Sequence, residues 1–224
     1  ASLLPWLGLP EKSFAVISTG TWVISLAVGA KRVDLDPARD TLINVNAKGE
    51  PTPTARFMGG REFDQIAGST RAALEQDLQS VLRDRIMLLP AVENASGPFP
   101  GSRHSWTPCE PRSDGERIAA ASFYCALMTA TCLDLIGADG PFIVEGPFAA
   151  NPHYLAMLGV ALQGPVFTST GSTTGTAIGA ALLAGSSGTL LPELNAGQIE
   201  NLDHQSYRFY SRHWFSSVAS SAAT

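Results

Sequence analysis

The sequence has few charged residues and no excess of basic ones. Charged residues make up 16% of the 224 residues, and 15 Lys and Arg against 20 Asp and Glu leave a net charge of −5. A protein that binds a phosphate backbone needs a basic surface, so we expect no nucleic-acid partner. The hydrophobic fraction of 45% can fill a core in a chain of this length, which excludes a disordered protein.

Cysteine and histidine are scarce, and their spacing does not suit metal or redox chemistry. The three cysteines, Cys109, Cys125 and Cys132, form no C-x-x-C pair and cannot make a closed set of disulfides. This usage argues against a secreted disulfide scaffold and structural zinc, and favours a cytoplasmic protein. The four histidines show no metal-ligand spacing, and no G-x-S-x-G motif accompanies them, so we assign them no catalytic role.

Targeting and membrane-spanning segments are also missing. The opening residues, ASLLPWLGLP, have no basic region and no long apolar run, which excludes a signal peptide and favours a cut into a longer chain. The longest apolar run, residues 118–133, falls short of the roughly 20 residues that span a bilayer and carries Ser, Thr and Tyr hydroxyls. We expect a buried core helix there and no membrane partner.

The first third of the chain favours strands followed by helices. Residues 14–27 are two apolar, β-branched runs around Thr19-Gly20, which predicts a hairpin. The alternating run 42–46 predicts a third strand that completes a meander. Residues 57–67 and 70–83 have helical spacing, with Gly59-Gly60 best placed at the start of the first helix.

The rest of the chain alternates helices and strands after a long loop. Residues 93–115 are rich in proline and have no periodicity, so we expect a surface excursion. Periodicity and end signals then predict helices at 115–136, 151–162 and 175–184, strands at 142–145 and 166–168, and a closing amphipathic helix within 196–217. No internal repeat is visible, which favours one domain over residues 1–224.

Several turns could carry chemistry, and each also has a purely structural interpretation. The hairpin tip Ser18–Trp22 could bind an anionic oxygen through backbone amides, but Thr and Gly are ordinary turn residues. Asn151, after the strand ending Glu145-Gly146-Pro147, lies where α/β sheets bind ligands, or caps a helix. The Gly/Thr-rich run 170–181 has neither the P-loop lysine nor G-x-G-x-x-G spacing, and its small residues suggest close packing against another helix or a moving domain.

The order of these segments is more specific than any one of them. STGTW at residues 18–22, FMGGREF at 57–63 and GTAIGAALLA at 175–184 together resemble the C-terminal domain of the FGGY carbohydrate kinases, in the superfamily of actin and the heat-shock ATPases. The resemblance covers residues 1 to about 215. It implies an α/β, ribonuclease-H-like fold with a mixed sheet and flanking helices, and it implies that the N-terminal kinase domain is absent from this chain.

The resemblance also implies a nucleotide site for ATP with Mg²⁺. Gly20 and Thr21 would lie near the terminal phosphates, Gly60 near the ribose and α-phosphate, and Gly146 with Asn151 near the adenosine, with Thr19 and Glu145 in support. Pro147 stands where family members often have a second glycine, which weakens the expected contact at that turn. The helix 175–184 would be the inter-domain connector. The catalytic aspartate of the family is expected upstream of Ala1.

The implied function is transfer of the γ-phosphoryl group of ATP to a sugar hydroxyl. Trp22 after Gly-Thr resembles the rhamnulokinase and fuculokinase branch, which favours a ketose. The partners are then a small sugar, ATP and the N-terminal domain, and a homodimer is left open. The alternative is a non-catalytic truncated domain that binds nucleotide or a partner. An actin-like or chaperone ATPase is disfavoured, since no polymer-forming or peptide-binding surface is evident.

Overall fold

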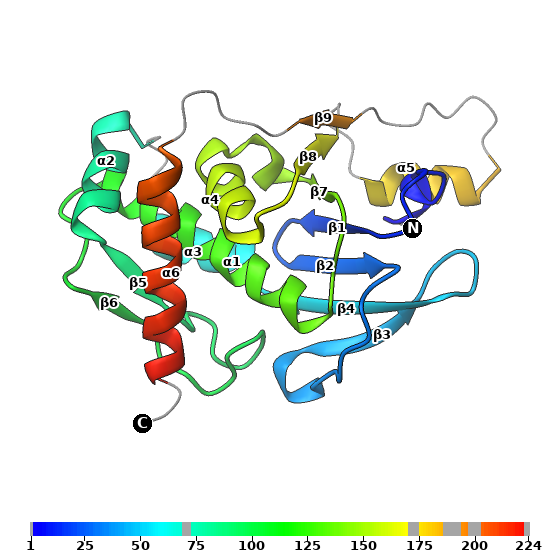
Figure 1. Cartoon of the computed structure of the whole chain (residues 1–224), viewed down its shortest axis with the longest axis horizontal. Coiled ribbons are helices and arrows are strands. Elements are labelled where there is room, and N and C mark those ends of the chain that lie inside the picture. The colour runs from blue at the N-terminus through cyan, green and yellow to red at the C-terminus, as the bar shows by residue number, and fades with distance from the viewer. Residues whose placement is uncertain (1, 69–72, 170–174, 186–193, 197–202, 222–224) are drawn as a thin grey trace.

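The computed structural model describes residues 2–68, 73–169, 175–185, 194–196 and 203–221 (Figure 1). After a short 3-10 helix, η1 (Leu4–Trp6), strands β1 (Phe14–Thr19) and β2 (Val23–Val28) pair antiparallel from Phe14↔Val28 to Thr19↔Val23. The expected hairpin is confirmed.

The expected meander is wrong in one respect. The third strand, β3 (Thr41–Val45), pairs not with β2 but with a strand that we did not anticipate, β4 (Pro51–Phe57), which lies between them. Pro51 and Pro53 hid β4 in the sequence, because proline cannot donate a ladder hydrogen bond and is rare inside sheets. Both prolines lie in the part of β4 that extends past its pairing with β2, which covers only residues 54–57.

The sheet continues on the other side of β1. Strand β7 (Phe142–Glu145) runs parallel to β1, β8 (Val166–Ser169) runs parallel to β7, and the short β9 (Leu194–Ala196) closes this edge antiparallel to β8. In the described part of the chain the order is β3-β4-β2-β1-β7-β8-β9. The strands expected at 142–145 and 166–168 are confirmed, whereas β9 was not expected.

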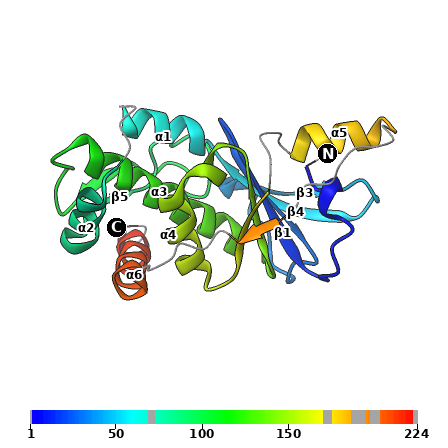
Figure 2. The ribbon, with the colours of Figure 1, turned by 90° about the horizontal axis from the view of Figure 1, so that it is seen from above.

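Helices cover both faces of this sheet, as Figures 1 and 2 show from two directions. One face carries α1 (Gly59–Ala67), α3 (Asp114–Leu135) and α4 (Pro152–Leu162). The opposite face carries η1 and α5 (Gly175–Leu183), which contact each other. These positions agree with the expected helices, and Gly59-Gly60 do begin α1.

A third layer lies outside α3 and α4. It consists of α2 (Glu75–Asp84), the closing helix α6 (His204–Ser221) and a small antiparallel pair, β5 (Met87–Leu89) with β6 (Ser105–Thr107). Two buried α6 side chains hold this layer together, because Tyr210 donates to the Ile86 carbonyl at 2.9 Å and Trp214 donates to the Leu88 carbonyl at 2.7 Å.

The segment expected as a surface excursion, residues 93–115, contains strand β6 and the start of α3. It is anchored at one point to the turn before β3. The Gly97 amide donates to Asp40 at 2.7 Å, and Arg39 donates to the Pro98 carbonyl at 2.8 Å. Gly97 and Pro98 are buried, so this part of the segment lies under the surface.

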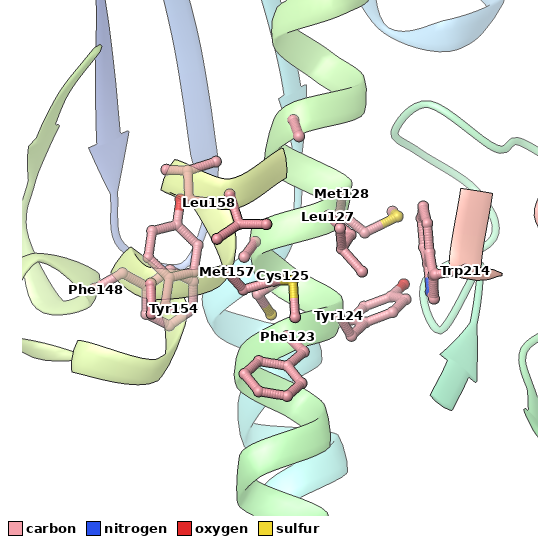
Figure 3. Close-up of a cluster of buried hydrophobic side chains, with 14 of the residues drawn as sticks. Phe123, Tyr124, Cys125, Leu127, Met128, Phe148, Tyr154, Met157, Leu158 and Trp214 are labelled. Atoms are coloured by element: carbon pink, nitrogen blue, oxygen red, sulfur yellow. The ribbon is translucent and has the colours of Figure 1, made fainter. Parts of the chain in front are cut away.

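The sheet separates two hydrophobic cores. Along β1, Ala15 and Ile17 belong to the larger core beneath α3, and Phe14 and Val16 belong to a smaller core against η1, since successive side chains point to opposite faces. Figure 3 shows the larger core, in which α4 side chains such as Met157 and Leu158 pack against α3. Both faces of β1 are therefore fixed by packing.

Helix α3 lies at the centre of the larger core. Among the helices in the described residues, it has the length and hydropathy of a membrane span. Of its most apolar 18-residue window, 83% is buried inside the protein. Ser113 caps its start by accepting the Glu116 amide at 3.1 Å. The expectation of a buried core helix over this apolar run is confirmed.

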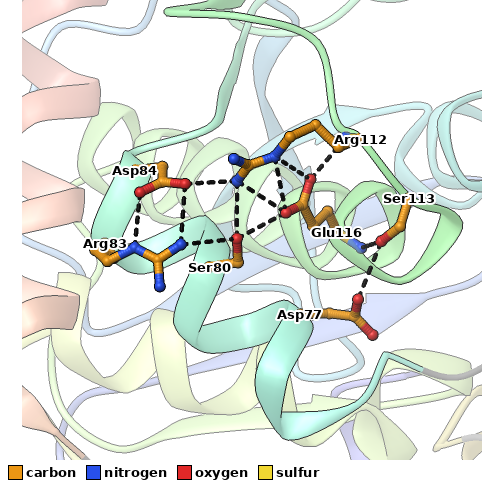
Figure 4. Close-up of polar contacts among 7 residues, drawn as sticks. All are labelled: Asp77, Ser80, Arg83, Asp84, Arg112, Ser113 and Glu116. Carbon is orange, nitrogen blue, oxygen red and sulfur yellow. Dashed lines mark hydrogen bonds and ion pairs between the residues drawn. The ribbon is translucent and has the colours of Figure 1, made fainter.

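A network of charged groups joins the start of α3 to α2 (Figure 4). Arg112 donates to Asp84 at 2.5 Å and lies 2.9 Å from Glu116, and Ser80 donates to the same Glu116 carboxylate at 2.7 Å. Arg83 and Arg112 hold the pKa of Asp84 low, at about 2, through hydrogen bonds. The network fixes the outer layer to the central helix on the solvent side.

Candidate functional site

The β1–β2 turn and the start of α1 form the first wall of a hollow. The turn is closed by the Gly20 amide, which donates to the Trp22 carbonyl at 2.9 Å. The Arg61 amide donates to the Thr21 carbonyl at 3.3 Å, so the first turn of α1 lies directly on the hairpin tip. A side chain at Gly60 has no room, because its Cβ would lie 2.1 Å from the Gly20 carbonyl oxygen.

The turn after β7 forms the second wall. Gly146 has φ +82°, a conformation that favours glycine. A Cβ there would also lie 2.0 Å from the Thr19 carbonyl oxygen, so a side chain has no room at this position. A 3-10 turn, η3 (Pro147–Ala150), then leads to Asn151, which caps α4 by accepting the Tyr154 amide at 3.1 Å and donates to the Ser122 hydroxyl at 3.0 Å. Its structural interpretation as a helix cap is confirmed.

Between these walls lies a hollow of about 390 Å³. Four of the five residues expected to bind nucleotide line it, namely Gly20, Thr21, Gly60 and Asn151, while the fifth, Gly146, shapes the turn beside it without lining it. These residues are far apart in the sequence. The structure brings them to the carboxyl ends of β1 and β7, the edge of an α/β sheet at which ligands bind.

Sequence reasoning missed the aromatic part of this site. Phe63 and Phe148 line the hollow, with ring centroids 5.5 Å apart in an edge arrangement. Phe63 belongs to the FMGGREF segment and follows Gly60 by one helical turn, which places it on the same side of α1. The glycine pair singled out this segment in the sequence. The helical period could also have predicted that the Phe63 ring lies on the same side of α1 as Gly60.

The two carboxylates that follow the glycine pair point to different places. Asp64 lines the hollow. Glu62 is buried in the larger core, where the Tyr124 hydroxyl donates to its Oε2 at 2.5 Å, and burial raises its pKa to about 7. Its side chain therefore belongs to the core between α1 and α3.

The supporting residues Thr19 and Glu145 lie behind the hollow. The Thr19 hydroxyl donates to the Glu145 carbonyl at 2.5 Å and accepts the Phe148 amide at 3.1 Å. The Glu145 carboxylate points to the opposite face of the sheet, where it accepts the indole N–H of Trp6 at 2.9 Å. It does not line the hollow.

The hairpin tip and the N-terminus of α1 border the hollow, and neither of these described segments places a cluster of metal ligands there. Among the described residues no three His, Cys, Asp or Glu side chains gather as metal ligands, and Asp64 is the carboxylate that lines the hollow. The backbone of the hairpin tip and the N-terminus of α1 meet where Gly60 leaves no side chain in the way. A helix N-terminus with such close backbone approach suits phosphate oxygens.

A larger groove of about 1140 Å³ lies elsewhere on the molecule. It includes the residues just before β7 and β8, such as Pro141 and Pro165, together with side chains near the end of α6. It thus opens at the amino ends of these parallel strands. None of the residues expected to bind nucleotide lines it.

Comparison with known proteins identifies the class to which this fold and hollow belong. Residues 11–192 match the family model described as carbohydrate kinase FGGY, C-terminal domain. The chain therefore belongs to the FGGY carbohydrate kinase family and corresponds to its C-terminal domain. The predicted family and the mixed sheet with flanking helices are confirmed.

Solved structures of this family share the fold. A carbohydrate kinase from Novosphingobium aromaticivorans is 32% identical with a TM-score of 0.82, and the match covers 98% of this chain and 49% of that one. The xylulose kinase from Bifidobacterium adolescentis shares 17% identity with a TM-score of 0.64, over 95% of this chain and 45% of that one.

A glycerol kinase from Plasmodium falciparum, solved with ADP, shares 11% identity with a TM-score of 0.59, over 92% of this chain and 46% of that one. The two lower identities support the fold alone. The chain spans about half the length of each of these structures. No protein of curated function matches it in sequence.

Proposed function

We propose that this chain is the nucleotide-binding half of an ATP-dependent kinase that phosphorylates a hydroxyl of a ketose-type sugar. The observation that carries the proposal is the close backbone contact between Gly60 and Gly20, which brings the hairpin tip against the N-terminus of α1 at the edge of the hollow that both residues line. Phosphate oxygens suit the N-terminus of a helix. The proposed partner in catalysis is the N-terminal half of the kinase, which would supply the sugar-binding residues and the catalytic aspartate.

Each candidate residue has a specific proposed task. Thr21 orients the terminal phosphates through its backbone amide and its hydroxyl, Gly20 keeps the hairpin tip free of a side chain there, and Gly60 allows α1 to approach the phosphate chain. Asn151 and the Gly146 turn form the end of the hollow proposed for the adenosine, where Phe63 and Phe148 offer flat apolar surfaces. Thr19 supports the site from behind by holding the Phe148 amide.

Catalysis by such a half consists of alignment and charge neutralisation. Bound ATP would supply the phosphoryl group, and Mg²⁺ bound with it would neutralise phosphate charge. The residues of this chain hold the phosphates in line with the acceptor hydroxyl and leave no room for competing water once the two halves close. The choice of a ketose derives from the resemblance of the STGTW segment to the rhamnulokinase and fuculokinase branch.

Calorimetric titration of the 224-residue chain with Mg²⁺ and ADP tests nucleotide binding. The chain should bind, and Gly60→Ala should weaken binding strongly, because the new Cβ would collide with the Gly20 carbonyl and displace the hairpin tip. Gly8→Ala is the matched control, since nothing lies within 4 Å of its Cβ position. Absence of binding, or equal affinity in the two variants, would contradict the proposal.

Sugar phosphorylation is tested separately. This chain alone should produce no ADP from ATP and a panel of ketoses above background, because the aspartate that accepts the sugar proton is expected in the other half. Robust turnover by the chain alone would contradict that division of labour. Nucleotide binding without phosphorylation by a preparation that contains both halves would favour a non-catalytic nucleotide-binding domain instead.

A further inference from the structure

Glu145, the last residue of β7, has hydrogen bonds on both faces of the sheet. On the side of the hollow, its carbonyl oxygen accepts the Thr19 hydroxyl at 2.5 Å. The same hydroxyl accepts the amide of Phe148, a residue that lines the hollow, at 3.1 Å. Thr19 thereby ties the end of β7 to the turn that forms one wall of the site.

On the other face, the Glu145 side chain anchors two elements at once. It is only 1% exposed, and its Oε1 accepts the Trp6 indole N–H from η1 at 2.9 Å. A Cβ at Gly175, the first residue of α5, would lie 2.1 Å from Oε1 and 2.4 Å from Oε2. The carboxylate thus lies directly against the N-terminus of α5, where a negative charge stabilises a helix.

Helix α5 has few other attachments among the described residues. Its buried residues are two glycines, Gly175 and Gly179, and Leu183 near its end is 62% exposed. A hydrogen bond of 2.6 Å between the Ser2 and Thr176 hydroxyls joins it to the segment before η1. Because the glycines bury little side-chain area, the Glu145 carboxylate is a main anchor of α5 on the sheet.

We infer that Glu145 is a positioning residue that couples the hollow to η1 and α5. Displacement of Thr19 or of the 146–148 turn shifts the end of β7, and the carboxylate carries this shift to the Trp6 indole and the start of α5. The ligand side of this inference depends on the proposed nucleotide site, whereas the mechanical link does not. Coupling between two sites is reciprocal, so a change at α5 also alters affinity in the hollow.

The Trp6 indole N–H is a direct reporter of this link. In nuclear magnetic resonance spectra of the ¹⁵N-labelled 224-residue chain without ligand, its signal is assigned by its loss in Trp6→Phe. Thr19→Val removes the hydroxyl and keeps the shape, so it should shift the Trp6 signal although residue 19 does not bond to Trp6. Thr129→Val is the matched control, because Thr129 is a buried hydroxyl on α3 that bonds to Cys125 and Tyr154.

A Trp6 signal that responds equally to both valine substitutions, or to neither, overturns the inference whatever binds in the hollow. Titration of the same sample with Mg²⁺ and ADP then tests the ligand side. We expect the Gly20 and Gly60 amides and the Trp6 indole to shift together. Glu145→Gln, which can still accept the Trp6 N–H but loses the charge at α5, should weaken binding about fivefold or more.

The outcomes separate the two proposals. Shifts at Gly20 and Gly60 without a shift at Trp6, or unchanged affinity in Glu145→Gln, would overturn the coupling and leave the nucleotide site standing. No shift at Gly20 or Gly60 would contradict the nucleotide site, and the ligand-free comparison of Thr19→Val with Thr129→Val would still decide the link. If Glu145→Gln does not fold, Trp6→Phe takes its place in the affinity measurement.

Discussion

Tyr124 and Glu62 share a hydrogen bond of 2.5 Å inside the core, between the central helix α3 and the helix that borders the hollow. The Tyr124 hydroxyl also accepts the Val92 amide at 3.3 Å, so three segments meet at one phenol. Burial is the main reason that the pKa of Glu62 rises to about 7; the bond from Tyr124 lowers it, and the nearby Glu93 carboxylate raises it. A titratable group therefore lies within the packing that supports α1.

The first prediction is that the free energy of unfolding falls as the pH rises through 7. The pKa of Glu62 is higher in the folded chain than its usual 4.5, so the folded state binds the proton more tightly. The stabilisation is complete below about pH 4.5 and is lost as the pH passes 7, by about 3 kcal/mol at most. Urea denaturation at pH 5 and pH 8 measures this difference.

Glu62→Gln is the test of that assignment. Gln cannot ionise and still offers an acceptor to Tyr124, so the variant should lose less stability than the native chain between pH 5 and pH 8. Glu11→Gln, an exposed substitution of the same kind, should behave as the native chain. Identical pH dependence in all three proteins would show that Glu62 does not titrate in this range.

The second prediction concerns nucleotide affinity in a preparation that contains this chain together with the proposed N-terminal half. Thr21→Ala should raise the KM for ATP about tenfold, the effect of losing one hydrogen bond to a charged group. Asn151→Ala should also raise it, and in addition should lower stability by about 1 kcal/mol, because Asn151 caps α4. Steady-state kinetics at saturating sugar measures both.

The matched control for Asn151 is Ser113→Ala, which removes the cap of another buried helix, α3, far in sequence from the hollow-lining residues. It should lower stability and leave the KM for ATP unchanged. If Ser113→Ala raises the KM as much as Asn151→Ala does, the effect at Asn151 is one of stability. Unchanged kinetics in both Thr21→Ala and Asn151→Ala would remove these residues from the site.

The third prediction is that Arg112 stabilises the outer layer through charge. Arg112→Gln should lower the free energy of unfolding, because the variant loses the ion pairs with Asp84 and Glu116. Since the Arg112 and Asp84 side chains are 54% and 30% exposed, salt should screen their ion pair, and 1 M NaCl should narrow the difference in unfolding free energy from the native chain. Chemical denaturation at two salt concentrations tests this, and a difference that does not depend on salt would show lost packing instead.

The fourth prediction is that one of the three thiols reacts in the folded chain. Cys109 is exposed, whereas Cys125 and Cys132 are buried, and burial raises the pKa of both buried thiols above the usual range. Ellman's reagent at pH 8 should therefore modify one thiol per native chain and three in 6 M urea. Cys109→Ser should show no fast reaction. Rapid labelling of two or more native thiols would contradict the described burial.

The sequence was informative where one local rule acts alone. The Thr19-Gly20 turn, the capped start of α4 at Asn151 and the apolar run of α3 each have a strong local signal, and the structure agrees with each. Strand β4 has a contrary signal, since its prolines disfavour a strand in general but are tolerated where they lie beyond β2. Local propensity could not reveal which strand would lie beside it.

The sequence singled out Gly20 and Gly60, which line the hollow, but it did not show in which direction the nearby carboxylates point. Alternation along β7 implies that Glu145 points the same way as Ile143, but it does not say on which face the hollow lies. The same limit applies to Glu62. Its position in the helix does not reveal that the Tyr124 hydroxyl, about sixty residues later in the chain, donates a hydrogen bond to its carboxylate. Such directions depend on contacts between distant segments.

Because a core lies on each side of the sheet, alternate residues of its central strands must face opposite cores. Ile143 faces the smaller core and Val144 the larger one, so insertion or deletion of a single residue within β7 would send each side chain to the wrong face. The Glu145 carboxylate would then enter the apolar interior beneath α3. Insertions and deletions can accumulate in the loops around this strand. Within β7, only substitutions are compatible with the fold, because they leave each side chain on its own face of the sheet.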